Sequence, residues 1–122
     1  MAAGTLTFSE TTHGSVKKIV ATWTSGTGAE GGTASATTVN AYDGKLIGLT
    51  TDPGATAPMD NYGLTVTDGT HDVLLGAGAA RDTANTEHVA EASLGAVAGS
   101  KLTFAIANAG DAKVGVAILW IR

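Results

Sequence analysis

The chain has 122 residues, a formal net charge of −4 and no cysteine. This length suits one domain. Seven Lys and Arg against eleven Asp and Glu leave no basic surface for nucleic acid, and the absence of cysteine excludes disulfides, thiolate metal sites and a cysteine nucleophile. No segment approaches the roughly 18 apolar residues of a membrane helix, and no signal peptide is evident. We therefore expect no membrane and no nucleic-acid partner.

Apolar and polar residues alternate with a period of two through much of the chain, which is typical of half-buried β-strands. The alternation begins with Leu6 and Phe8 and recurs in the segments 16–24, 45–51, 62–67, 70–75 and 102–107. A further strand is expected near Glu87–Leu94. In the last segment, Lys113–Ile121, both alternating sets are apolar, which predicts a central strand buried on its two faces.

Turn residues separate these strands at short intervals. Asp43-Gly44 and Asp52-Pro53-Gly54 flank the strand 45–51, and Asp68-Gly69 predicts a tight hairpin between 62–67 and 70–75. Asn108–Asp111 predicts a second hairpin that joins the last two strands. The segment 25–35 and most of 76–93 are rich in Gly and Ala, and we expect them to be loops.

Seven to nine short strands with turns between them predict an all-β protein, an antiparallel β-sandwich with jelly-roll-like connectivity and long Gly/Ala-rich loops. Residues 1–12 are expected to form an N-terminal arm or edge strand, and residues 13–122 a single sandwich domain. Val, Ile, Leu and Phe make up only about a fifth of the chain, so the core is lean. Small domains with lean cores gain stability from association, which favours an oligomer or a docked partner.

The sequence carries no strong catalytic or cofactor motif. Gly26–Gly31 matches GxGxxG, but a poor helix former follows it, so we interpret the match as chance. A metal site would require the pairs His71-Asp72 and Glu87-His88 to meet, together with Glu91, and neither the HxH nor the HExxH spacing of known sites is present. An enzyme would require His71, His88 and Glu91 to converge in a pocket. We expect no catalytic residue, no metal and no cofactor.

The six aromatic residues suggest a different alternative. Trp23, Phe104 and Trp120 occupy core-phase strand positions and are expected to pack in the interior. Tyr42 and Tyr62 flank turns, where their rings could be exposed. A carbohydrate-binding module, which stacks sugars on a flat row of exposed aromatic rings, is therefore a second hypothesis.

Several ordered segments carry a resemblance to a known group of proteins. They are Gly44–Gly54, Ala57–Tyr62, Leu64–Asp68, Asp72–Leu74, Gly78–Glu87 and Leu102–Gly110, within a match that covers roughly Val16 to Ile121. This series resembles small virion structural proteins of tailed bacteriophages.

The resemblance implies a capsid decoration, or cement, protein. Such a protein binds the major capsid protein at capsomer junctions on the capsid exterior, commonly as a homotrimer, after synthesis in the bacterial cytoplasm. It has no catalytic residues. A head–tail connector or another tail component is the closest alternative. Because an N-terminal arm can add a strand to a partner's sheet, Leu6 and Phe8 are the candidate partner-binding residues.

Overall fold

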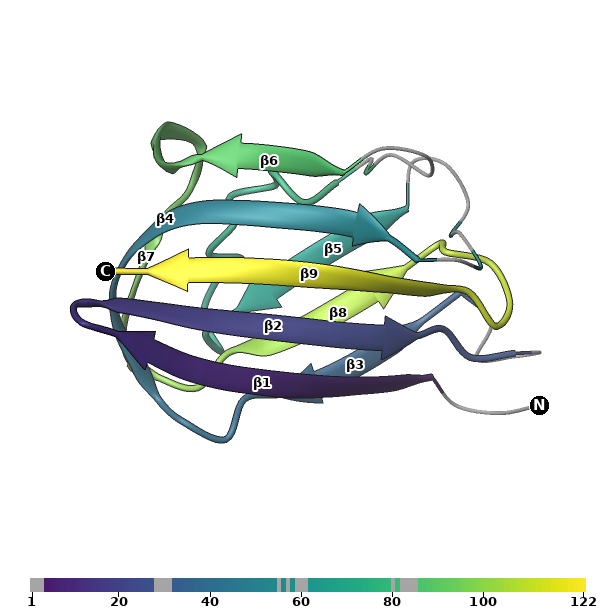
Figure 1. Ribbon diagram of the computed structural model, residues 1–122, viewed down its shortest axis with the longest axis horizontal. Helices are drawn as coiled ribbons and strands as arrows, with labels where there is room; N and C mark the ends of the chain where they lie inside the picture. The colour runs from purple at the N-terminus through teal and green to yellow at the C-terminus, as the bar shows by residue number, and fades with distance from the viewer. Residues whose placement is uncertain are drawn as a thin grey trace.

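The computed structural model describes residues 4–27, 32–54, 56, 58, 62–79, 81 and 86–122. Within these ranges, strands form two sheets that pack face to face, so the predicted antiparallel β-sandwich is confirmed (Figure 1). The strands are β1 (Thr5–His13), β2 (Val16–Thr24), β3 (Ala34–Thr37), β4 (Tyr42–Pro53), β5 (Gly63–Thr67), β6 (Glu87–Ala90), β7 (Ala96–Ser100), β8 (Thr103–Ala107) and β9 (Val114–Ile121). A short 3-10 turn, η2 (Glu91–Ser93), follows β6. The jelly-roll connectivity stays a prediction.

The two sheets differ in size. The large sheet has the order β1-β2-β9-β4-β6, with β7 paired to the first part of β4, and the small sheet has the order β3-β8-β5. All of these pairs are antiparallel. β1 lies at one edge of the large sheet and also contacts β3, the edge strand of the small sheet (Figure 1).

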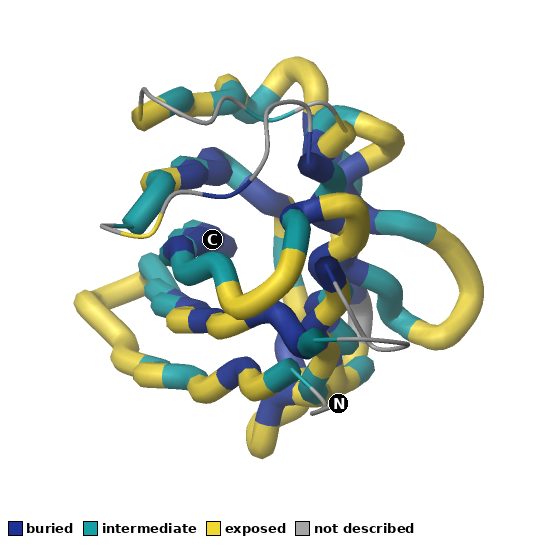
Figure 2. The backbone as a smooth tube through the Cα atoms, turned by 90° about the vertical axis from the view of Figure 1, so that its right-hand side faces the viewer, coloured by how far each residue is buried: buried dark blue, intermediate teal, exposed yellow. Residues whose placement is uncertain are grey.

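The core lies between the sheets, where each strand contributes every second side chain. Buried residues accordingly alternate with more exposed ones along the chain in Figure 2. Trp23 and Phe104 are buried as predicted. The Trp23 ring packs against Tyr62 at 5.5 Å, and Phe8 meets Phe104 edge-on at 5.2 Å between ring centroids. Such aromatic pairs contribute about 0.5–1.5 kcal/mol each beyond the area that they bury.

β9 holds the centre of the large sheet, but only one of its faces is buried. Gly115, Ala117, Leu119 and Ile121 point into the core. The alternate residues, Val114, Val116, Ile118 and Trp120, lie on the outer face and are partly exposed. The prediction of a strand buried on two faces is therefore wrong, as is the placement of Trp120 in the core. A two-layer sandwich covers only the inner side of each sheet.

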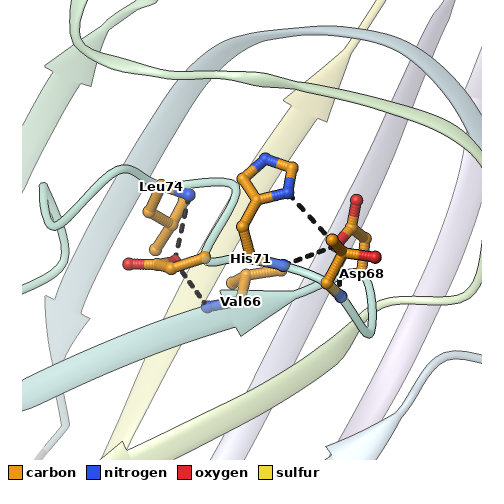
Figure 3. A network of polar contacts seen from close by, with 6 residues as sticks. Val66, Asp68, His71 and Leu74 are labelled. Atoms are coloured by element: carbon orange, nitrogen blue, oxygen red, sulfur yellow. Dashed lines mark hydrogen bonds and ion pairs between the residues drawn. The ribbon is translucent and has the colours of Figure 1, made fainter.

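The predicted hairpin after β5 forms its turn but not its second strand. Gly69 adopts a φ of 94°, and one isolated bridge, Thr67 to Asp72, follows the turn. The Asp72 carboxylate then accepts hydrogen bonds from the backbone N–H groups of Val66 and Leu74 (Figure 3). It also accepts one from Gly76 N, and together these bonds curl the chain into consecutive turns. Val73 and Leu74 are thereby buried.

A second network in Figure 3 fixes the tip of this turn. The Asp68 carboxylate accepts hydrogen bonds from the backbone N–H groups of Thr70 and His71, and it lies 3.4 Å from the His71 ring. The two backbone hydrogen bonds are the main reason that the pKa of Asp68 lies below its usual value. Asp68 and Asp72 thus have a structural role, because their hydrogen bonds fix the turns that follow the end of β5.

The other turn predictions also need correction. The segment 108–113 does not close a hairpin, because β8 belongs to the small sheet and β9 to the large one. Asp43 and Gly44 lie within β4, at a register shift against β7. The strand expected near Glu87–Leu94 is β6 followed by η2. In the loop expected at 25–35, β3 already begins at Ala34, and residues 28–31 lie outside the described ranges.

Candidate interaction faces

The outer surface of the large sheet, here called the large-sheet face, carries an apolar stripe. The stripe consists of outward side chains of β2 and β9 that are partly exposed: Val20, Val114, Val116, Ile118 and Trp120. The register places them next to one another, because Val20 lies opposite Ile118. Antiparallel sheets with one solvated face normally present polar residues there. No described element therefore covers this apolar surface.

Trp120 lies at one end of the stripe, opposite a bulge in β4. The β4–β9 register shifts between Leu46 and Gly48, so Gly48 lies opposite Trp120. A Cβ atom on Gly48 would lie 2.9 Å from the His88 ring and 3.2 Å from the Trp120 ring. The two rings are 5.8 Å apart, and Thr50 Oγ1 is hydrogen-bonded to His88 Nδ1 at 2.9 Å. Gly48 thus leaves room for two adjacent outward rings.

Hydroxyl side chains flank the stripe, and the strands contribute few charges to this face. The outward hydroxyl residues are Thr5, Thr7, Ser9 and Thr11 of β1, Thr22 and Thr24 of β2, and Thr50 of β4. Among the outward positions of these described strands, the charged residues apart from the histidines are Lys18, Asp43, Lys45 and Asp52. Asp43 and Lys45 lie at the start of β4, beyond the end of the stripe, where Lys45 N donates a hydrogen bond to Arg122 O. Lys18 lies opposite Trp120 and Asp52 opposite Val116, on either side of β9.

The outer surface of the small sheet, the small-sheet face, has no charged residue among its outward strand positions. These positions hold Ser35, Thr37, Gly63, Thr65, Thr67, Thr103, Ala105 and Ala107. The hydroxyls of Thr37 and Thr103 are hydrogen-bonded across β3 and β8 at 2.8 Å. Side chains this short let a partner's backbone approach closely.

A shallow hollow lies at the end of β1, with a volume of about 260 Å³. The Glu10 carboxylate in it accepts hydrogen bonds from the Tyr42 hydroxyl at 2.5 Å, from the backbone N–H groups of Val39 and Asn40, and from the Asn40 side chain. Burial raises the pKa of Glu10, but these hydrogen bonds outweigh it and hold the pKa below 4.5. Glu10 therefore ties the β3–β4 connection to β1, and its lone pairs are already engaged.

The two candidate partner-binding residues lie inside the sandwich. Leu6 is 8% exposed and belongs to the core, and Phe8 is partly buried against Phe104. Both are on β1, which pairs with β2 along its whole length. In this conformation their side chains pack within their own domain. A contact of Leu6 and Phe8 with a partner subunit stays a prediction.

The two tyrosines whose exposure the carbohydrate-binding hypothesis requires are buried. Tyr42 is 6% exposed and Tyr62 is 1% exposed. Tyr62 packs against Trp23, and Tyr42 directs its hydroxyl to Glu10. Neither ring can stack on a sugar, so the flat row of aromatic rings on which the carbohydrate-binding hypothesis depends is not formed by these residues.

The structure does not bring the candidate metal residues together. His71 lies at the turn after β5, His88 on the outward side of β6, and Glu91 in η2. In the described part of the chain, no three His, Cys, Asp or Glu side chains form a group that could hold a metal ion. The GxGxxG match includes residues 28–31, which lie outside the described ranges.

No helix in the described residues is long and apolar enough to cross a membrane. Comparisons of the chain with protein family models, with curated proteins and with solved structures find no match.

Proposed function

We propose that this chain is a non-enzymatic structural protein of a bacteriophage virion that decorates the capsid exterior and stabilises it by binding the major capsid protein at capsomer junctions. The observation that carries the proposal is the pair of broad faces on opposite sides of the sandwich, one with an apolar stripe and one with no charged outward strand residue. A protein that joins subunits needs at least two contact surfaces, whereas an enzyme needs a concave site with titratable groups. The resemblance of the sequence to virion proteins supports the same function.

The small-sheet face is the surface that we assign to the capsid. Its Thr, Ser, Ala and Gly side chains form a low relief, so a capsid subunit can approach the backbone of β3, β8 and β5 closely. Each contact of this kind is weak, but a capsid offers many equivalent sites to a decorating unit that carries more than one such face. Multivalent attachment then makes overall binding strong.

Co-sedimentation with capsids of the phage that encodes the chain tests this function. We expect the chain to sediment with capsids and to saturate at a fixed number of copies per capsomer. Thr65→Glu places a carboxylate in the exposed centre of the small-sheet face and should weaken binding about tenfold or more, because the charge loses its hydration in the contact.

Thr12→Glu is the matched control, because Thr12 is exposed at the end of β1, outside both faces. It should bind capsids as the wild type does. A chain that stays in the supernatant at every capsid concentration would rule out decoration, and equal binding by the Thr65→Glu and Thr12→Glu variants would rule out the small-sheet face as the contact.

A further inference from the structure

We propose that the large-sheet face is the surface through which two copies of this chain pair, face to face, about a two-fold axis. This inference concerns the chain alone and goes beyond the proposed function. It rests on three features of the large-sheet face: its apolar stripe, its extent and the positions of the two charged residues beside the stripe, Lys18 and Asp52.

The apolar stripe supplies the driving force. Val20, Val116 and Ile118 form a contiguous apolar centre, and Trp120 adds a large, partly exposed ring at one end. Removal of apolar surface from water is worth about 25 cal/mol per Å². Tryptophan is also enriched among the residues that dominate binding energy at protein interfaces. A solvent-facing row of this kind on a central strand favours a covering partner.

The area of the large-sheet face is at the small end of the areas that each partner buries in specific protein complexes. Five strands at a spacing of about 4.8 Å, with a rise of about 3.3 Å per residue, span roughly 600 Å² over about eight residues. Specific complexes bury about 600–1,000 Å² on each partner. Two copies packed on this face therefore reach the lower end of that range.

The charges identify the partner as a second copy. Lys18 on β2 lies opposite Trp120, two residues from Ile118 in one direction along β9. Asp52 on β4 lies opposite Val116, two residues from Ile118 in the other direction. The two charges therefore lie on a diagonal with Ile118 at its midpoint. The Thr86 hydroxyl donates a hydrogen bond to Asp52 Oδ1 and helps to fix this carboxylate.

A diagonal of opposite charges makes the face self-complementary. Consider a two-fold axis that lies between two such faces, passes over Ile118 and runs perpendicular to the Lys18–Asp52 diagonal. This axis places each Lys18 over Asp52 of the other copy, as an isologous interface requires. The stripe then packs on itself at the centre, and one ion pair lies on either side of it. The resemblance to decoration proteins implies a trimer, whereas this geometry gives an even number of copies.

The mass of the purified chain in solution, measured over a range of concentrations, tests the pairing. The wild type should approach twice the monomer mass. Lys18→Asp and Asp52→Lys should each weaken pairing about tenfold or more, because each creates two like-charge contacts. Mixing these two variants in equal amounts should restore pairing, because in the mixed pair both contacts again join opposite charges. The double variant Lys18→Asp/Asp52→Lys should pair as the wild type does.

Two further variants separate pairing from folding. Ile118→Thr keeps a β-branched residue in β9 but removes apolar surface at the centre of the face, so it should weaken pairing while circular dichroism stays that of the wild type. Lys101→Asp is the charge control, because Lys101 is exposed outside this face, and it should leave pairing unchanged. A wild type that stays monomeric at high micromolar concentration, a trimeric mass, or a failure of the mixed variants to pair would each overturn the proposal.

Discussion

Single glycines determine how the large inward side chains fit in this lean core. Gly115 of β9 lies directly opposite Trp23 of β2. A Cβ atom on Gly115 would lie 2.5 Å from Trp23 Cζ2 and 2.8 Å from Cε2. The Trp23 ring cannot retreat, because it is buried and packs against Tyr62. The absence of a side chain at Gly115 thus provides the space that the indole fills.

We expect Gly115→Ala to lower the free energy of unfolding by about 1–3 kcal/mol, the usual cost of overpacking a core. Gly63→Ala is the matched control in β5, where an added Cβ meets no atom within 4 Å and φ is not positive. It should stay within about 1 kcal/mol of the wild type. Urea denaturation measures the free energy of unfolding of both variants. Similar values for the two would contradict the packing that we describe around Trp23.

Glu10 makes part of the stability depend on pH. Its pKa is lowered in the folded chain, so its ionised form favours folding at every pH above about 4.5, its ordinary value. This contribution is lost as the pH falls through the lower pKa of the folded state. Glu10→Gln should therefore be less stable than the wild type at pH 7, and the difference should shrink below pH 4.5. Urea denaturation of both proteins between pH 7 and pH 3 measures the difference in their free energies of unfolding. A difference that stays constant over this range would refute the charge-dependent role of Glu10.

At the scale of elements, the turn segment after β5 replaces a predicted strand. Asp72 holds this segment through hydrogen bonds to backbone N–H groups on both sides of the turn, including that of Val66 in β5 (Figure 3). The backbone of the same segment runs along the edge of β5, where Leu64 N donates to Gly78 O at 2.8 Å and Val73 N donates to Val66 O at 2.8 Å. The segment thus covers an edge of the small sheet.

Asp72→Ala removes three acceptor contacts at once, and we expect it to lower the free energy of unfolding by about 1.5–3 kcal/mol. Hydrogen exchange should also speed up at the amides of Val66, Leu74 and Gly76. Asp111→Ala, in an exposed turn, is the control and should change stability by less than about 0.5 kcal/mol. Unchanged exchange at these three amides in Asp72→Ala would show that Asp72 does not organise the segment.

The period-two pattern predicted that strands exist and where most of them lie, but not how they pair. Turn residues such as Asn108 occur both in hairpins and in connections that cross between sheets. Asn108 and Ala112 both adopt positive φ, and the connection that contains them leads from one sheet to the other. Local sequence chemistry is the same in both cases, so only the packing of the two sheets decides between them.

The candidate faces were harder to predict than the strands, for a related reason. In β9 both alternating sets are apolar, so the pattern alone does not tell which set faces the core. Only the small residues Gly115 and Ala117 distinguish the inward set, which faces the core together with Trp23 and Ala21 of the neighbouring β2. The hydrogen-bonded position of Glu10 could not be predicted from the sequence, because its donors lie about 30 residues further along the chain.

For the molecule as a whole, the two faces explain how a small domain with a lean core can act within an assembly. In the described part of the chain no element covers the stripe on the large-sheet face, and on our proposal it is covered when two copies pair. The small-sheet faces then lie on the far sides of the pair and stay available. A paired unit therefore carries two capsid-binding surfaces, which is the arrangement that multivalent attachment needs.

Electron microscopy of the phage capsid, with and without the bound chain, tests capsid decoration most directly. We expect added density of sandwich size on the capsid exterior, repeated at the junctions between capsomers, with β3, β8 and β5 facing the capsid subunits. Density confined to the head–tail vertex or to the tail, or no density at all, would contradict the account.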